Sequence, residues 1–412
     1  MYIQVYLCDL IADLLNVYTQ PKNKGPLVDR WILWTSGLLS FFAGALYGWS
    51  ALISPIQTAF TVTTSQAGLV FSWAIVSFTL GVIISPGSFK SLPPSLRLSG
   101  FGIIACLSLS LSVFVDSYFK FIILFSGGFG TMSGAIYITS VGIAANSKKY
   151  KISTPIMVAI FGAGGAVFGP MWRLLDKKGW GLDGLLILAA GLAAGSLLVG
   201  IGSWVTKPVI EVGRPKLFLF KWRQYLNLKF VLTWLVFAFG SFGGLMVLGL
   251  ASKMMDVSGL SVGVVSLVLA CLAIFNTLGR LSVAGFVQVI EVQNCIFIAL
   301  ALSMIGFLSI YLGIGLAIGL ILISAGYGVI AATIPAVTRT VFGALVFQPI
   351  FAIMMTAWGF SGFFAPWISG IIFDNTGSFS GALFLASGMM VLCGLTTLML
   401  NNLIKTTSKK SF

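Results

Sequence analysis

The sequence has 412 residues, of which 58% are hydrophobic and only 8% are charged, and its mean hydropathy is +1.04. A surface exposed to water needs roughly a quarter to a third charged residues, so this composition excludes a water-soluble protein and indicates one that crosses a membrane several times. The apolar runs are nearly continuous over about 20 residues and lack the alternation of barrel strands, so we predict that the spans are helices.

Twelve apolar segments are long enough to span a membrane. In chain order, we predict spans near residues 32–56, 66–87, 98–115, 121–145, 154–173, 184–205, 229–251, 260–285, 293–311, 313–336, 346–372 and 379–402. The longest polar stretch separates the sixth span from the seventh. The predicted organisation is an all-α polytopic membrane protein with an N-terminal segment (1–31), a six-helix half (32–205), a linker (206–228), a second six-helix half (229–402) and a tail (403–412).

The net charge is +14, with 24 Lys and Arg against 10 Asp and Glu, and the cations gather in alternate loops. If the N-terminus is inside, most of them lie at the cytoplasmic face, including those of the basic linker between Lys207 and Lys229. We therefore expect both termini and the linker to be cytoplasmic. The positive charge then reflects topology and attraction to the anionic lipid bilayer, and no nucleic-acid partner is expected.

The N-terminal segment and the cysteines indicate no targeting or redox function. Residues 1–20 contain no Lys or Arg, and their apolar stretch is too short for a standard signal peptide, which leaves a short interfacial amphipathic helix or a mis-assigned start. The five cysteines form no CxxC pair, so we expect buried thiols and no disulfide, metal site or cofactor. The lack of a signal or transit peptide favours a bacterial inner (plasma) membrane.

Several spans carry motifs whose order and spacing resemble those of one family. These motifs are Ala43–Pro55 in span 1, Gly243–Gly249 in span 7, Phe275–Arg280 in span 8, Gly326–Gly328 with Pro335 in span 10, and Thr356–Gly362 followed by Asp374–Phe379 in span 11. They resemble the oxalate/formate antiporter family of the major facilitator superfamily, which is related to the monocarboxylate transporters. The resemblance implies the major facilitator fold, whose two halves rock about a central site. It also implies that the arginine of span 8, here Arg280, pairs with a carboxylate substrate.

Arg280 is the one charged residue within a long apolar run, from Ser261 to Gly285. A guanidinium at bilayer depth costs at least ~2.5–3.5 kcal/mol and does not lose its proton, so something must use or compensate the charge. Its planar fork of donors suits a carboxylate, and no acidic residue in mid-span neutralises it. The alternative is a structural arginine, satisfied by backbone carbonyls or by Asn276 at i−4 on the same helix face.

Trp358 marks a departure from relatives that use two cations. Where those carry lysine in span 11 within Ala-Lys-Gly, this chain has Ala357–Gly359 with Trp358 in the middle. A dicarboxylate would face a single cation, and its second carboxylate would be desolvated without compensation. We therefore predict a monocarboxylate substrate, with Trp358 either lining the cavity or serving as an ordinary packing residue.

The titratable residues limit how transport is driven. The chain has no histidine, and we assign all 10 Asp and Glu to the N-terminal segment or to loops. Proton-coupled carriers usually hold a carboxylate or imidazole at membrane depth, so we expect anion exchange or uniport unless the proton travels on the substrate. The loops after spans 2 and 8, Gly87–Arg97 and Gly285–Glu291, lack the aspartate that usually joins the two halves in this superfamily. This loss indicates altered gating, a diverged lineage or relaxed constraint.

The remaining candidates are aromatic residues in mid-span, whose hydroxyl or indole group would bind a carboxylate while the wall stays apolar. They join Arg280, Asn276 and Trp358 in the predicted substrate site and are Tyr47, Trp49, Trp73, Tyr137 and Tyr327. Each of them would serve equally well as a packing residue.

Together these features predict a monomeric secondary transporter that moves a small organic anion, in particular a monocarboxylate, by alternating access as an exchanger or uniporter. The alternatives are a carrier of an amino acid or another zwitterionic or neutral solute, and a carrier-derived sensor that transports nothing. An enzyme is not expected, because the spans contain no paired aspartates, His-rich cluster or Ser with Lys. A channel would more often show a ring of like charges or a repeated filter motif.

Overall fold

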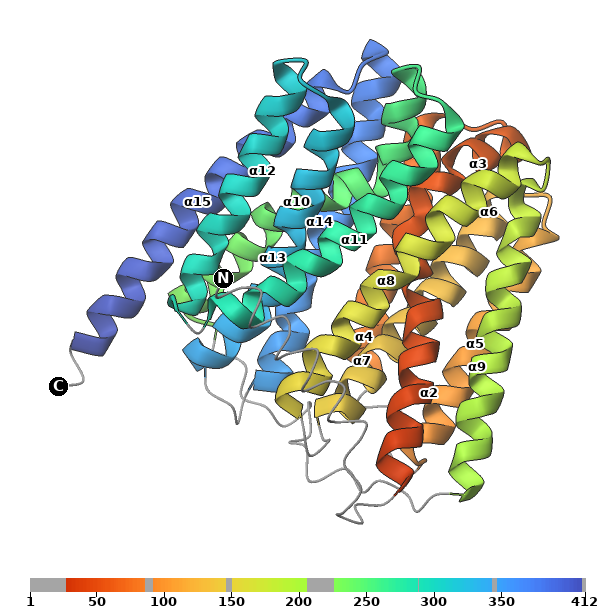
Figure 1. Cartoon of the computed structure of the whole chain (residues 1–412), viewed down its shortest axis with the longest axis horizontal. Coiled ribbons are helices and arrows are strands. Elements are labelled where there is room, and N and C mark those ends of the chain that lie inside the picture. Colours follow the sequence, from red (N-terminus) through yellow and green to blue (C-terminus); the bar gives the residue numbers. More distant parts are fainter. Residues whose placement is uncertain are drawn as a thin grey trace, which may run out of the picture.

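The computed structural model describes residues 27–85, 92–145, 150–205, 226–287, 289–342 and 347–409, and within these ranges every regular element is a helix. In this described part of the chain, twelve spans are long and apolar enough to cross a membrane. They stand side by side as an elongated bundle (Figure 1). The predicted all-α polytopic architecture is confirmed, and the chain is an integral membrane protein.

The first six spans form the N-terminal half. Three elements follow one another as the first span, and three short elements begin or interrupt later spans. The elements are α2 (Leu27–Ala43), η1 (Gly44–Leu52), α3 (Ile53–Phe60), α4 (Thr64–Ile84), α5 (Pro94–Val113), α6 (Tyr118–Phe121), η2 (Ile122–Gly130), α7 (Thr131–Ala145), α8 (Tyr150–Lys177), η3 (Gly181–Gly184) and α9 (Leu185–Val205).

The last six spans form the C-terminal half. Its elements are α10 (Leu228–Val257), α11 (Val262–Phe286), η6 (Val292–Asn294), α12 (Cys295–Tyr311), α13 (Leu316–Phe342), α14 (Phe347–Thr376) and α15 (Ser380–Lys409). Consecutive spans run in opposite directions, so their ends define two faces (Figure 1). We call the face where α9 ends and α10 begins the linker face, and the face where α3 ends and α4 begins the far face.

Local side-chain chemistry sets several helix ends. Thr63 and Gln66 form a capping box at the start of α4, and Ser261 caps α11 through the Val264 amide. Gly377, with φ of 68°, ends the turn after α14. Only glycine adopts this conformation without strain, so the chain reverses there into α15.

Glycine lets the helices of each half approach closely. A Cβ on Gly134 of α7 would lie 2.0 Å from the carbonyl oxygen of Phe78 on α4, and one on Gly44 would lie 1.7 Å from that of Phe161 on α8. These separations are far below contact distance, so a larger residue would force the helices apart. Close packing through small residues is a main source of helix association inside a membrane.

Two spans are interrupted by a long stretch that is not α-helical, whereas η3 and η6 are short 3₁₀ turns at the start of their spans. η1 is a 3₁₀ helix and η2 is a π-helix, each of 9 residues. Both are long for their kind, and such stretches inside helices often mark functional sites. η1 is buried along its whole length, packs against α8 and α10, and carries Tyr47. A backbone irregularity therefore coincides with a predicted site residue.

The two halves meet where α4 packs on α14, α8 packs on α11, and η1 packs on α10. Glycines bring these helices together as well. A Cβ on Gly370 of α14 would lie 2.6 Å from the Cα of Ser65 at the start of α4, and one on Gly162 of α8 would lie 3.2 Å from Thr277 Oγ1 on α11. The helices of the two halves therefore approach closely at these glycines. The site described below lies within this interface.

The helices extend further than the apolar runs that predicted them. α8 continues to Lys177 and α14 to Thr376, because polar side chains at a helix end reach out of the hydrocarbon without breaking the helix. The assignment of every acidic residue to the N-terminal segment or a loop is consequently wrong. Asp176, Asp256 and Asp374 lie in the last turns of α8, α10 and α14, at the far face.

Two arginines that were placed at the edges of predicted spans are buried within helices. Arg97 lies in the first turn of α5 with 4% of its surface exposed, and Arg173 lies in α8 with 9% exposed. The predictions made for the N-terminal helix or mis-assigned start, for most of the loop after span 2 and for most of the basic linker fall on residues outside the described ranges.

The close approach at Gly134 gives a stability prediction. Gly134→Ala should lower the free energy of unfolding by about 1–3 kcal/mol, because its Cβ overlaps the α4 backbone. Gly100→Ala in α5 is the matched control, since nothing lies within 4 Å of its Cβ, and alanine there should be neutral or stabilising by about 0.5–1 kcal/mol. Chemical unfolding in mild detergent measures both, and equal stabilities would contradict this account of the packing.

Candidate functional site

Arg280 is buried at the interface of the two halves, with 6% of its surface exposed. Its Nε donates a hydrogen bond to Asn276 Oδ1 at 3.0 Å, and its Nη2 donates to the Tyr47 hydroxyl at 3.1 Å. Asn276 belongs to the same helix, α11, whereas Tyr47 comes from η1 of the N-terminal half. The guanidinium therefore bridges the two halves.

A second layer of hydrogen bonds holds Asn276 in place. Its Nδ2 donates to the carbonyl oxygen of Ser324 on α13 at 3.0 Å, and the Ser324 hydroxyl donates back to the Leu272 carbonyl of α11 at 2.8 Å. Because its amide N–H₂ is engaged in this way, the Asn276 carbonyl oxygen is left facing Arg280. One edge of the guanidinium is thus fixed by the C-terminal half alone.

Two tyrosines and a tryptophan form a polar chain beside Arg280. The rings of Tyr47 and Tyr327 lie 5.5 and 5.9 Å from the guanidinium carbon, within the range of cation–π attraction. Their hydroxyls are 3.4 Å apart and share a hydrogen bond, and Trp358 Nε1 donates to the Tyr327 hydroxyl at 2.6 Å. Residues from η1, α11, α13 and α14 thus converge on one point.

Aromatic rings enclose this polar chain on the side of the N-terminal half. The ring of Phe161 on α8 lies 5.3 Å from that of Tyr47 and 4.9 Å from that of Tyr137 on α7. Phe78 of α4 completes the wall, at 5.6 Å from Tyr137 and 5.2 Å from Trp358. The surroundings of Arg280 are therefore apolar apart from a few hydroxyl, amide and indole groups.

The partners of Arg280 given by the structure are neutral. The ion pairs found in the described part of the chain are Arg173 with Asp256 and Lys120 with Asp116, and neither includes Arg280. A buried charge held by neutral dipoles is only partly compensated. The site therefore carries a net positive charge in a medium of low dielectric, where an anion would be attracted strongly.

The structure brings six of the eight predicted site residues together and leaves two elsewhere. Trp73 is 43% exposed and packs on Phe363, because it lies about 140° around α4 from Phe78, at 3.6 residues per turn. Trp49 is fully buried but packs on Phe71 and Phe125 inside the N-terminal half. In a 3₁₀ helix two residues are about 120° short of a full turn, so Trp49 points away from the direction of Tyr47.

Three residues of this cluster were missed by sequence analysis. Phe78 and Phe161 stand in apolar runs, where a phenylalanine carries no signal of its own. Gly162 has no side chain to mark it as a site residue, yet a Cβ there would lie 3.8 Å from Asn276 Oδ1 and 3.9 Å from Arg280 Nε. The small residue keeps α8 close to the guanidinium.

No protein-family model and no curated protein matches the sequence. Solved structures do match it. One is the D-xylose-proton symporter, with a TM-score of 0.71 and 14% identity over 89% of this chain and 96% of that chain. Another is a bacterial homologue of the human lysosomal transporter Spinster in an inward-facing, unoccupied conformation, with a TM-score of 0.62 and 15% identity over 91% of this chain and 96% of that chain.

Similarity at this level of identity establishes the fold. The chain has the major facilitator fold, with two halves of six spans, as its layout predicts. Neither of these two structures tests the resemblance to the oxalate/formate antiporter family, so that closer relationship stays a prediction.

The two roles weighed for Arg280 make opposite predictions about stability. Arg280→Gln should leave the free energy of unfolding within about 1 kcal/mol of the wild type or raise it, because it removes a buried charge that has no anionic partner. Arg173→Gln is the comparison, since it breaks an ion pair with Asp256 and should cost about 1–3 kcal/mol. Chemical unfolding in detergent measures both, and a larger loss for Arg280→Gln would assign it a structural role.

Proposed function

We propose that the protein is a secondary transporter for a small monocarboxylate, which binds to Arg280 between the two halves. The observation that carries this proposal is a buried guanidinium whose partners are neutral, at the contact of two six-helix halves. A permanent charge that costs several kcal/mol to bury is retained where an anion uses it. The fold supports a carrier, because its halves can rock around a central site.

The hydrogen bonds around Arg280 support a carboxylate ligand. The Tyr47 hydroxyl takes up one N–H of the guanidinium at 3.1 Å. A carboxylate is a better acceptor than a phenol, because its full negative charge lies opposite the guanidinium and its two oxygens can accept two parallel N–H bonds. On binding, the substrate replaces the Tyr47 oxygen at Nη2, and the freed hydroxyl donates to the second carboxylate oxygen.

The aromatic rings around the polar chain support a substrate with a single negative charge. Trp358, Phe78 and Phe161 are buried rings, and Trp358 offers only its indole N–H, which donates to Tyr327. A second carboxylate at this wall would lose its hydration with no cation to replace it. A methyl, keto or hydroxyl group would be accommodated, because the wall combines apolar rings with a few hydrogen-bonding groups.

Transport then follows from exposure of this site to one face at a time. We assign the linker face to the cytoplasm by the excess of Lys and Arg in the loops and linker on that side, in a bacterial inner membrane. The chain works as a monomer, because one copy supplies every group of the cluster. Exchange or uniport is favoured, since the titratable acids of the described spans lie at their ends, away from Arg280.

Uptake into liposomes tests the substrate and the role of Arg280. The purified protein should take up radiolabelled pyruvate, lactate or formate in a saturable manner, and Arg280→Gln should reduce this uptake by about a hundredfold or more, the loss expected for two charge-assisted hydrogen bonds. Oxalate and zwitterionic amino acids should compete poorly. Uptake that survives the substitution, or that prefers amino acids, would contradict the proposal.

Replacement of Trp358 tests the charge argument. Trp358→Lys adds a second cation opposite Arg280 and should shift the preference from monocarboxylate to oxalate by about tenfold or more, as one compensated charge is worth at least ~1.4 kcal/mol. Trp358→Phe is the control, since it keeps an apolar ring and should keep monocarboxylate uptake. Robust oxalate uptake by the wild type would show that a single cation is enough and would refute this reading of Trp358.

The coupling prediction concerns the driving force. Uptake should rise several-fold when the same carboxylate is preloaded inside the liposomes, as exchange requires, or should follow the substrate gradient alone, as in uniport. A protonophore should leave the initial rate unchanged at a pH at which the substrate is fully ionised. Uptake that depends on an imposed proton gradient under these conditions would instead require a titratable group near the site.

A further inference from the structure

Asp374 joins the two halves at the far face. It lies in the last turn of α14, and its Oδ1 and Oδ2 accept hydrogen bonds from the backbone N–H groups of Thr64 at 3.1 Å and Ser65 at 2.8 Å. These amides belong to the first turn of α4, where N–H groups have no partner within the helix and the helix dipole favours a negative charge. A carboxylate of one half therefore caps a helix of the other.

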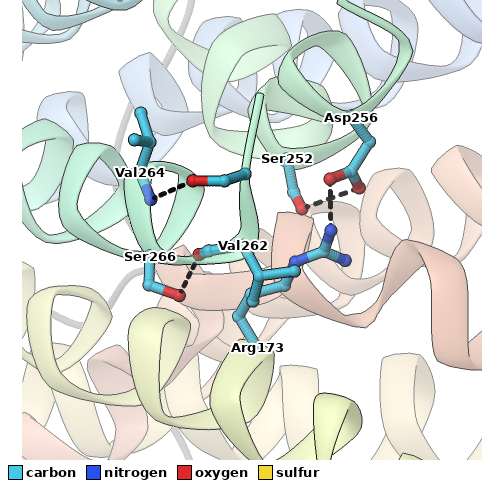
Figure 2. A network of polar contacts seen from close by, with 7 residues as sticks. Arg173, Ser252, Asp256, Val262, Val264 and Ser266 are labelled. Carbon is cyan, nitrogen blue, oxygen red and sulfur yellow. Dashed lines mark hydrogen bonds and ion pairs between the residues drawn. The ribbon is translucent and has the colours of Figure 1, made fainter. Parts of the chain in front are cut away.

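Arg173 and Asp256 form a second link at the same face. Arg173 reaches from α8 to the Asp256 carboxylate near the end of α10, and the Ser252 hydroxyl lies 3.5 Å from its other oxygen (Figure 2). Both charged side chains are largely buried, with 10% and 21% of their surface exposed. Partial burial makes this pair stronger than an exposed one, because solvent screens it less.

Close packing closes the path between these links and Arg280. On the far-face side of Tyr47, the residues of η1, α8, α10 and α11 leave a cavity of only about 10 Å³, lined by Tyr47, Gly48, Ser50, Gly165, Gly169, Leu248, Leu269, Leu272 and Ala273. This is at most the space of one water molecule. A carboxylate substrate does not fit in this cavity, so this route from Arg280 to the far face is closed while the two halves keep these contacts.

We propose that Asp374 with the first turn of α4, together with the Arg173–Asp256 pair, forms a far-face gate that must break before the site opens to that side. Each link joins a different pair of helices, α14 with α4 and α8 with α10, so the two hold the halves at separate points. The Asp374–Phe379 segment thereby gains a role that substrate binding does not explain. The inference rests on the alternating access proposed above.

Cysteine accessibility tests the gate without any substrate. In a variant with the five native cysteines replaced, Ser50→Cys places a thiol in the closed path, where Ser50 is 2% exposed. A membrane-impermeant maleimide is applied to the far face and, separately, to the linker face. Asp374→Asn and Arg173→Gln should each raise the far-face labelling rate about tenfold, because each removes an interaction worth about 1.4 kcal/mol from the closed state.

Two further variants keep the test decisive. Asp116→Asn is the matched control, since Asp116 forms an exposed ion pair with Lys120 within one half, and loss of this pair should change the labelling rate less than about twofold. The exchanged pair Arg173→Asp with Asp256→Arg should restore slow labelling if the ion pair itself closes the path. All variants are first checked for a single peak in gel filtration.

Unchanged far-face labelling in both Asp374→Asn and Arg173→Gln would overturn the gate, as would an equal rise in Asp116→Asn. Failure of the gate is distinct from failure of the proposed function. Labelling reports opening alone, whereas the identity of the substrate is decided by uptake and by Arg280→Gln.

Discussion

The candidate site is built around one unfavourable interaction, the burial of a permanently charged guanidinium between two apolar halves. Arg280 is held by one amide oxygen and one phenol, which satisfy its hydrogen bonds without neutralising its charge. Asn276 and Ser324 fix one edge from within the C-terminal half, whereas Tyr47 is the only hydrogen-bond partner it has from the N-terminal half among the described residues. An anion that displaces this phenol changes how the halves are joined, which links binding to motion.

Glycine lets the two halves pack closely around this site. Gly162 and Gly362 make room for the side chains of Thr277 and Ile75, and Gly370 lies against the backbone of Ser65, so the halves pack closely through small residues on one side of each contact. The far face is then closed by polar links of Asp374 and Arg173, which are strong only at short range. Packing brings the halves into register, and a few polar contacts decide which face is shut.

The spans and the position of Arg280 inside one of them could be predicted, because continuous hydropathy and a lone charge are local signals in the sequence. It did not separate Tyr47, which touches Arg280, from Trp49, which packs inside one half, because the 3₁₀ geometry of η1 sets the direction of each ring. Phe78 could not be distinguished from the other apolar residues of its span by sequence alone. Asp374 was assigned to a loop, since its helical position and its partner on α4 depend on tertiary contacts.

The central claim is that Arg280 is kept for an anionic substrate, which displaces the Tyr47 hydroxyl from the guanidinium when it binds. The most direct measurement is an experimental structure of the protein with a transported monocarboxylate. The account predicts a carboxylate oxygen within hydrogen-bonding distance of Arg280 Nη2, with the Tyr47 hydroxyl displaced from the 3.1 Å contact that it makes here. A carboxylate bound elsewhere, with the Arg280–Tyr47 contact intact, would contradict it.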